Sequence, residues 1–214
     1  MTILERYGSE ILSGLLYTLG TSAAATVLAI ALGLILAFVN GLPLLPVRIV
    51  CRAYIDFMRG TPILVQLFLL YYVGPSFGVR LDAVTAGVLG LAANGGAYFA
   101  EIFRSGFESI PRGQIEAARL LQFSELQVVT KIKLPQMLRL ILPPSVNQVI
   151  ILVKESSILS ILTVPELTKV TVKIVNETFA TTEPYIILAL LFWIIIECLS
   201  RAGRALERHI RWTL

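Results

Sequence analysis

Long apolar stretches separated by short polar segments run through the whole chain. A helix needs about 20 mostly apolar residues to cross a bilayer core of ~30 Å. The stretch from Ile11 to Val39 contains no charged residue, and four further apolar stretches follow it at 62–79, 83–107, 138–160 and 185–200. This pattern predicts an all-α integral membrane protein in which residues 1–214 form a single transmembrane domain of five spans.

Two of these stretches carry interruptions. The fourth, which starts at Leu138, contains Pro143-Pro144 and then Lys154-Glu155. The fifth is short unless its helix continues beyond Ile196. Five crossings would place the two termini on opposite sides of the membrane.

The composition supports a membrane protein and disfavours a soluble one. Hydrophobic residues make up 56% and charged residues 15% of the chain, and the mean hydropathy is +0.80, whereas ordinary globular chains carry about 25% charged residues. The two cysteines, Cys51 and Cys198, are far apart and lack the spacing of a metal site. We therefore expect no metal site, and we expect both thiols to be buried or without a specific role.

The charges between the spans predict an orientation. The net charge is −1 before the first span, +2 in the next segment and 0 in the one after. It is then +3 from Arg104 to Arg139, −1 from Glu166 to Glu183 and +2 in the tail from Glu197. Because basic residues accumulate on the cytoplasmic side, we predict an outside N-terminus, a cytoplasmic C-terminus and a cytoplasmic loop at 111–135.

This polar loop has the local signals of two short helices. Ile110 to Gly113 breaks the third span, and Gln114 to Leu121 predicts a first helix. Ser124 with Gln127 three residues later forms a capping-box pattern, so a second helix should begin at Ser124 and run toward Lys133. Pro135 is expected to end it, and the chain must turn at Gln122-Phe123.

The loop sequence EAARLLQFSELQVVTKIKLP resembles the EAA loop of ATP-binding-cassette importer permeases, whose cytoplasmic helix docks on a separate ATPase subunit. The family pattern is EAA, three residues, Gly, nine residues, Ile, one residue and Leu-Pro. Ile132, Leu134 and Pro135 follow that pattern, but Gln122 stands at the Gly position. Since a non-Gly residue in a left-handed turn costs ~1 kcal/mol or more, either Gln122 adopts that conformation or the elbow is more helical here.

The resemblance implies a set of ATPase-coupling residues in the loop. Small alanines would permit close approach of the partner, while larger apolar side chains would supply contact in a helix-in-groove mode. The alternative is an amphipathic helix on the inner leaflet, which the interleaved acidic residues disfavour. The implied coupling residues are Gly113, Glu116, Ala117, Ala118, Leu120, Leu121, Phe123, Leu134 and Pro135.

Three further segments extend the resemblance to the polar amino acid uptake family, which includes the histidine, arginine, glutamine and opine systems. FMRGTPILVQ (57–66) looks like the family's FRGTPLLVQ, AYFAEIFR (97–104) like AYxAEIFRGG, and KESSI (154–158) like KDTSL. The resemblance implies a type I importer permease fold in the bacterial cytoplasmic membrane. It also implies a second permease subunit, identical or homologous, two ATPase subunits that bind ATP and Mg, and an extracytoplasmic amino-acid-binding protein.

Polar residues within the spans are candidates for the substrate pathway, because such residues are costly in a membrane. Counting ~1.5 Å per residue puts Asn94 near mid-membrane, Glu101 closer to the cytoplasm and Glu155 in the outer half, so that Asn94 and Glu155 could face one cavity. Each has an alternative role: Glu101 could pair with Arg104, Lys154 could reach the surface, and Asn94 could serve helix packing beside Gly95-Gly96. The full predicted set is Asn94, Tyr98, Glu101, Lys154, Glu155, Ser156 and Ser157.

Two other functions compete with the permease. A secondary transporter would predict inverted repeats, which the sequence does not show. A membrane enzyme would need a reactive constellation, but the one histidine, His209, lies in the basic tail and the common catalytic motifs are absent. No GxxxxGK[ST] loop is present either, so we expect a non-enzymatic permease, without a cofactor or a nucleic-acid partner, that moves a polar amino acid while separate subunits hydrolyse ATP. The sequence does not choose the amino acid, nor a homodimer over a heterodimer.

Overall fold

The computed structural model describes residues 3–213, and this part of the chain consists of helices joined by short turns, without strands. The helices are α1 (Ile3–Asn40), α2 (Leu45–Gly60), α3 (Ile63–Phe68), α4 (Ala83–Glu108), α5 (Arg112–Leu120), α6 (Glu125–Gln127), α7 (Leu134–Glu155), α8 (Leu167–Thr178) and α9 (Thr182–Thr213). Two π-helical segments, η1 (Leu69–Val73) and η3 (Val128–Lys133), and two 3₁₀ segments, η2 (Gly74–Phe77) and η4 (Ser156–Leu162), join them. The predicted all-α class is confirmed.

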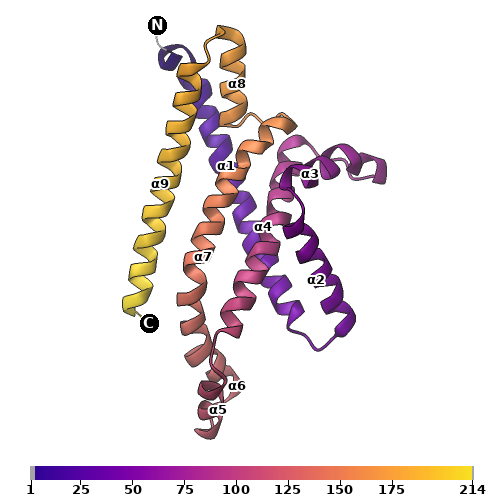
Figure 1. The fold of residues 1–214 in the computed structure, drawn as a ribbon, viewed down its shortest axis with the longest axis vertical. Helices are drawn as coiled ribbons and strands as arrows, with labels where there is room; N and C mark the ends of the chain where they lie inside the picture. The colour runs from indigo at the N-terminus through magenta and orange to yellow at the C-terminus, as the bar shows by residue number, and fades with distance from the viewer. Residues whose placement is uncertain (1–2, 214) are drawn as a thin grey trace.

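The long helices lie roughly side by side along one axis (Figure 1). α1, α4 and α7 form the centre, α9 lies along the outer side of α7, and α2 lies on the other side of the molecule. α1 begins near one end of this axis and α9 runs from there toward the other end, where α5 and α6 project beyond the end at which α4 finishes. The polar loop is therefore an extension of the helical body.

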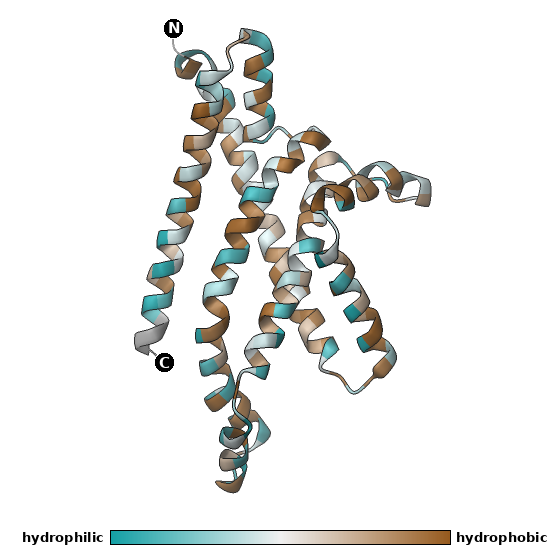
Figure 2. Cartoon of the chain, in the orientation of Figure 1, coloured by the Kyte–Doolittle hydropathy of each residue, from teal (hydrophilic) through white to brown (hydrophobic). Residues whose placement is uncertain are grey.

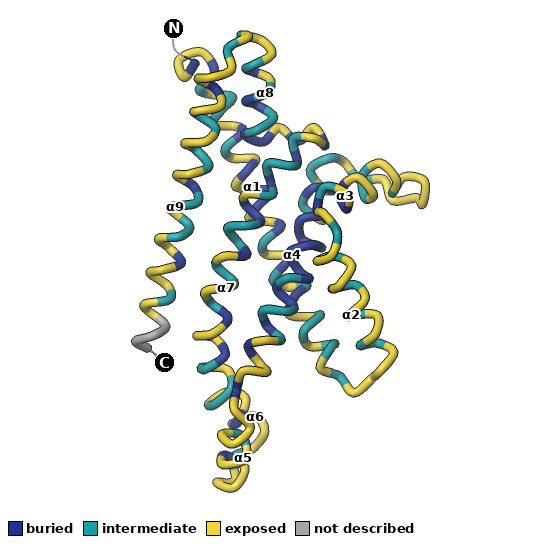
Figure 3. Tube along the Cα trace, viewed as in Figure 1, coloured by how far each residue is buried: buried dark blue, intermediate teal, exposed yellow. Residues whose placement is uncertain are grey.

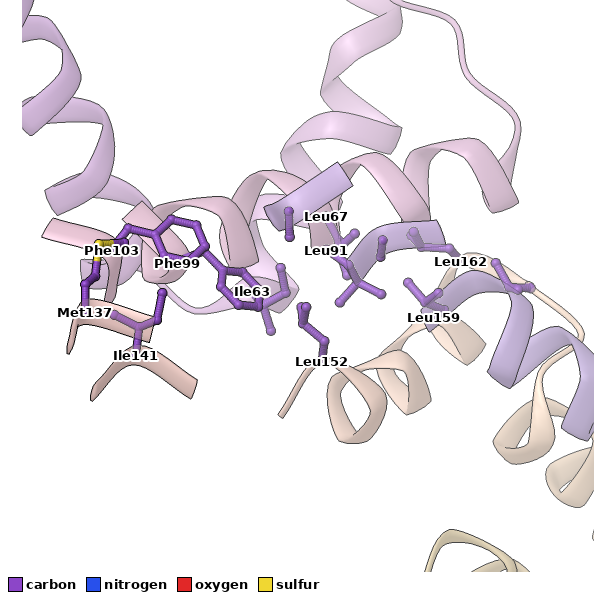
Figure 4. Packing of buried hydrophobic residues seen from close by; sticks show 13 residues of the cluster. Ile63, Leu67, Leu91, Phe99, Phe103, Met137, Ile141, Leu152, Leu159 and Leu162 are labelled. Carbon is purple, nitrogen blue, oxygen red and sulfur yellow. The ribbon is translucent and has the colours of Figure 1, made fainter. Parts of the chain in front are cut away.

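Small residues bring the central helices into close contact. A Cβ added at Gly33 of α1 would lie 2.5 Å from the Cβ of Phe99 in α4, and one added at Gly95 would lie 3.0 Å from a methyl group of Leu152 in α7. Membrane helices commonly pack through such small residues, because the apolar solvent supplies no hydrophobic force between them. Around this contact, leucine, isoleucine and phenylalanine side chains of α3, α4, α7 and η4 form a buried cluster, to which α1 contributes Ala25 and Ala29 (Figure 4).

The outer surfaces of the long helices are apolar and exposed. Figure 2 shows apolar residues along α9 and α1, and Figure 3 shows that many of them are exposed in the single chain. Examples are Val27 and Phe38 on α1 and Leu190 and Trp193 on α9. Within residues 3–213, four helical segments are long and apolar enough to cross a membrane, and α2 with the bent segment 63–77 would be a fifth. These surfaces suit lipid or other subunits better than water.

The stretch predicted as the second span, 62–79, is not one straight helix. It comprises α3, η1 and η2, and it follows an unpredicted helix, α2, from which it is bent by 110° at a break of a few residues. The hydropathy pattern did not predict α2, because charged residues interrupt its apolar residues. These charged residues are Arg48, Arg52, Asp56 and Arg59.

The breaks expected at Pro135 and at Pro143-Pro144 were wrong, whereas the interruption expected at Lys154-Glu155 coincides with the end of α7. Pro143 and Pro144 lie inside the continuous helix α7, and Pro135 is the second residue of that helix. The π-helical segment η3 leads directly into α7, and the N–H of Leu134 donates to the carbonyl of Val129 five residues back. Membrane helices tolerate proline in this way because local π or 3₁₀ adjustments satisfy the freed backbone groups.

Candidate functional site

The predicted coupling loop forms a rigid elbow after α5. The N–H of Phe123 donates to the carbonyl of Ala118 (3.0 Å) and the N–H of Gln122 to that of Arg119 (2.9 Å), which is the bond pair of a Schellman motif. Gln122 has a φ of 60°. Of the two alternatives for this residue, the structure therefore has the left-handed conformation, with glutamine where the family pattern has glycine.

The second half of the loop is fixed by the predicted capping box. The N–H of Gln127 donates to Ser124 Oγ (3.3 Å), and the N–H of Ser124 donates to Gln127 Oε1 (2.9 Å). Across the loop, Gln136 Nε2 at the start of α7 donates to Gln114 Oε1 in α5 (2.8 Å). These bonds tie the orientation of α5 to that of the membrane helix α7.

The loop presents leucine side chains to its surroundings. Leu120 and Leu121 at the end of α5 are 85% and 72% exposed, and Leu126 in α6 is 73% exposed. Gly113, Glu116, Ala117 and Leu134 are exposed as well, whereas Phe123 and Pro135 are half-buried.

Ala118 does not belong to that surface. It is 3% exposed, since α5 packs against η3, in which Val128 is also fully buried. Its small side chain therefore permits close packing within the loop, and not the approach of a partner that the sequence suggested. We define the coupling surface as Glu116, Ala117, Leu120, Leu121 and Leu126.

A second polar group lies at the bend between α2 and α3. Gln66 Nε2 donates to the carbonyls of Met58 (2.8 Å) and Thr61 (3.0 Å), and Asn94 Nδ2 in α4 donates to Met58 O and to Gln66 Oε1, both at 3.0 Å. The last carbonyls of a helix have no partner within it, so the two side-chain amides satisfy the end of α2 in a buried place.

This bonding corrects the expected position of Asn94. The side chain is 3% exposed and bridges three segments of the chain, so it does not face an open cavity with Glu155. Its neighbours Gly95 and Gly96 do pack closely against α1 and α7, as the packing alternative proposed.

The predicted pathway residues near the end of α4 form an ion-pair network. Arg104 donates to both carboxylate oxygens of Glu101, at 3.0 and 2.7 Å, and to Glu108 at 2.6 Å. Arg59 of α2 lies 3.6 Å from Glu101, and its guanidinium lies over the ring of Tyr98, 5.3 Å from the centroid. The alternative in which Glu101 pairs with Arg104 is what the structure shows, and α2 joins that pair.

The segment Lys154–Ser157 lies at the end of α7 that is farther from the coupling loop. Ser156 and Ser157 each donate a hydroxyl bond of 2.8 Å to a carbonyl of the preceding turn, so neither hydroxyl proton is free for a ligand. Lys154 is exposed. Oε2 of Glu155 is buried and has no hydrogen-bond partner among the described residues.

Two residues with clear structural roles were missed from the sequence. Gln66 was quoted within a motif but given no role, although an amide in an apolar helix is a signal in itself. Glu166 is fully buried and caps α8 by accepting the N–H groups of Thr168 and Lys169 at 2.8 and 2.7 Å. No periodic pattern marks such a residue, because its burial depends on α1 packing over the turn.

Comparisons with known proteins place this architecture in a family. Residues 29–212 match the model of the binding-protein-dependent transport system inner membrane component. A probable amino-acid ABC transporter permease protein, YckA of Bacillus subtilis, is 38% identical over 92% of this chain and 88% of its own length. The L-cystine transport system permease TcyB of the same organism is 35% identical, over 92% of this chain and 85% of its own length.

Solved structures agree with that match. A crystal structure of an amino acid ABC transporter with histidines has a TM-score of 0.90 and 35% identity, and it covers 98% of this chain and 100% of its own. The inward-facing methionine transporter MetNI has a TM-score of 0.80 at 18% identity, covering 98% and 99% of the two chains, which shows the shared fold. The protein is thus a multi-pass membrane permease. It belongs to the family of binding-protein-dependent transport system inner membrane components, the translocation subunits of ABC importers.

Proposed function

We propose that this chain, with a second permease subunit, forms the pathway through which an ATP-driven importer takes up a polar amino acid. Its relatives are named for amino acid, glutamine and L-cystine transport, which supports that substrate class. ATP and Mg bind to separate ATPase subunits, an extracytoplasmic protein delivers the amino acid, and this chain catalyses no reaction itself. The predicted orientation belongs to the proposal: the coupling loop faces the cytoplasm, where ATP is available.

The observation that carries this proposal is the coupling surface. Three leucines stand exposed on an elbow whose Schellman motif, capping box and Gln136–Gln114 bond hold it in one shape. Exposed apolar side chains on a rigid element are typical of a docking site for another protein. Because the elbow is hydrogen-bonded to α7, movement of a docked ATPase would be passed to the membrane helices.

The first test is co-purification with the ATPase subunit. We expect Leu121→Arg to weaken association about 30-fold, as for a central contact worth ~2 kcal/mol, and Glu116→Lys to weaken it as well. ATP hydrolysis by the purified complex should fall in parallel. Ala118→Arg is less informative, because the buried Ala118 would disturb the elbow itself.

The matched control is Phe77→Arg, which places the same charge on an 81% exposed side chain at the tip beyond α3. This variant should associate normally. Equal association of Leu121→Arg and Phe77→Arg would show that the loop does not couple to the ATPase.

The substrate pathway is a separate part of the proposal, and Glu155 is its strongest member. A buried carboxylate oxygen without a partner is unusual, and a zwitterionic amino acid could supply the missing donor. We expect Glu155→Gln to lower the rate or affinity of amino acid uptake while the ATPase subunit remains bound. Unchanged transport kinetics would remove Glu155 from the pathway.

A further inference from the structure

A cavity of about 410 Å³ lies between the end of α1, the start of α2 and the end of α4. The end of α1 and the start of α2, which line it, lie toward the end of the molecule from which α5 and α6 project (Figure 1). Its polar lining includes Asn40, Arg48, Arg52 and Arg104, and its apolar lining includes Phe38 and Phe107. None of these residues belongs to the coupling surface or to the predicted pathway.

The cavity lies where the membrane helices first carry charge. The charge-free stretch of α1 ends at Val39, and Arg48 is the next charged residue along the chain. On α4, no charged residue follows Asp82 until Glu101, and Arg104 comes three residues later. The lining therefore lies at the boundary between hydrocarbon and headgroups, where basic side chains meet lipid phosphates.

The charges of the lining are unbalanced. Three arginines face one carboxylate, that of Glu108, which is already bound to Arg104. Arg52 also borders a neighbouring hollow that contains Asp56 and Glu101. Arg48 has no such compensation: its Nε is buried without a hydrogen-bond partner among the described residues, as is the Oδ1 of Asn40. A donor and an acceptor are thus both unsatisfied at one site.

The surroundings of the cavity suit hydrocarbon chains. Phe38 is 72% exposed, and the neighbouring turn of α2 exposes Leu45, Ile49 and Val50. A ligand that meets both the arginines and these side chains must combine an anionic group with long apolar chains.

We propose that this cavity binds the headgroup of an anionic phospholipid. The phosphate would accept hydrogen bonds from Arg48 and Arg52, a headgroup hydroxyl would donate to Asn40 Oδ1, and the acyl chains would lie along Phe38 and the apolar face of α2. The bound lipid would join α1, α2 and α4 beside the Arg59–Glu101–Arg104 network. The inference goes beyond the transport function and depends only on the chain crossing a membrane.

The test is lipid retention by the purified permease complex in nanodiscs made from equal parts of phosphatidylglycerol and phosphatidylcholine. After transfer to detergent, native mass spectrometry counts the lipids that stay bound. The wild type should retain phosphatidylglycerol in preference to phosphatidylcholine. Arg48→Gln should weaken that retention about fivefold, and the double variant with Arg52→Gln about 25-fold, as expected for basic residues at a lipid surface.

The control is the double variant Arg80→Gln with Arg139→Gln, which removes the same charge from exposed arginines outside the cavity and should retain the lipid normally. Equal loss in both double variants, or no preference for phosphatidylglycerol, would overturn the proposal. Displacement of the lipid by millimolar glycerol phosphate would show that the cavity recognises a soluble phosphate and not a lipid. Disulfide cross-linking of Phe107→Cys between two copies of a chain that otherwise lacks cysteine would show that a second subunit covers the site.

Discussion

At the scale of single residues, the amides at the α2–α3 bend carry the clearest stability prediction. Asn94→Leu keeps the size of the side chain but removes the donor to Gln66 Oε1, while Met58 O keeps its bond from Gln66 Nε2. A buried polar group left without a partner costs ~1–3 kcal/mol, so the thermal midpoint of the purified chain should fall by several degrees. Asn176→Leu, the same change at an exposed position of α8, should leave the midpoint nearly unchanged.

A double variant separates the network from simple packing. Gln66→Leu added to Asn94→Leu removes both members of one hydrogen bond and also removes both donors of Met58 O, so the two substitutions should couple and the combined loss should differ from the sum of the single losses. Strict additivity would mean that the two amides act independently and that the bend does not depend on their bond.

Single residues also show how far sequence reasoning reaches. The capping box at Ser124 was predictable because both of its partners lie within three residues of each other. The pairing of Glu101 with Arg104 was one of two open alternatives, since the spacing permits it but only the packing decides it. The bonds of Asn94 to Met58 and Gln66 span about 30 residues of chain, and no local pattern could have indicated them.

At the scale of elements, we predict that the stability of the turn before α8 depends on pH through Glu166. Burial raises the pKa of this carboxyl above its ordinary value of 4.5, although N–H bonds from Thr168 and Lys169 and the charge of Lys169 act in the opposite direction. The folded chain therefore holds this proton more tightly than the unfolded chain. The stabilising contribution is fully present below pH 4.5 and is lost as the pH rises through the raised pKa.

Glu166→Gln should remove this pH dependence. In a thermal-melting series that starts at pH 4.5 and rises, the midpoint of the wild type should decline more steeply than that of the variant. Asp82→Asn is the control. Bonds from Thr85 lower the pKa of Asp82, so the stability that Asp82 contributes is lost as the pH falls. The thermal midpoint of Asp82→Asn should therefore still decline as the pH rises above 4.5, as that of the wild type does. Parallel curves for wild type and Glu166→Gln would contradict the assigned role of burial.

The elements themselves were predicted unevenly, for physical reasons. Hydropathy finds helices that face lipid on most sides, such as α1, but it fails for α2, where charged residues alternate with apolar ones. The span predicted from hydropathy starts at residue 138, whereas α7 starts at Leu134. The prediction began after Pro135 because a proline normally indicates a break in a helix, and Pro143 and Pro144 indicated a further break. Within the membrane, the loss of one hydrogen bond costs less than exposing a whole turn of backbone to lipid, so the helix continues through all three prolines.

At the scale of the whole molecule, the exposed apolar surfaces of α1 and α9 fit a permease that lies in a membrane. Glycines allow α1, α4 and α7 to pack closely, while α5, α6 and the helix ends that line the cavity lie toward one end (Figure 1). An ATPase docked at that end would act on α5 and, through the Gln136–Gln114 bond, on α7. The arrangement could be predicted from sequence only as a class of fold, because the contacts between helices depend on side chains far apart in the chain.

The orientation of the molecule can be tested directly by single-cysteine labelling in intact cells. Cys51 and Cys198 are first replaced by serine, and one cysteine is then introduced either at Gly113, which is exposed in α5, or at Thr181, which is exposed between α8 and α9. The charge distribution puts net +3 around the coupling loop and −1 around the α8 segment, so the positive-inside rule places Thr181 outside and Gly113 in the cytoplasm. A membrane-impermeant maleimide should therefore label Thr181→Cys in intact cells and Gly113→Cys only after permeabilisation. The reverse pattern would put the coupling surface on the side that lacks ATP, and the proposed docking of an ATPase on Leu120, Leu121 and Leu126 would have to be given up.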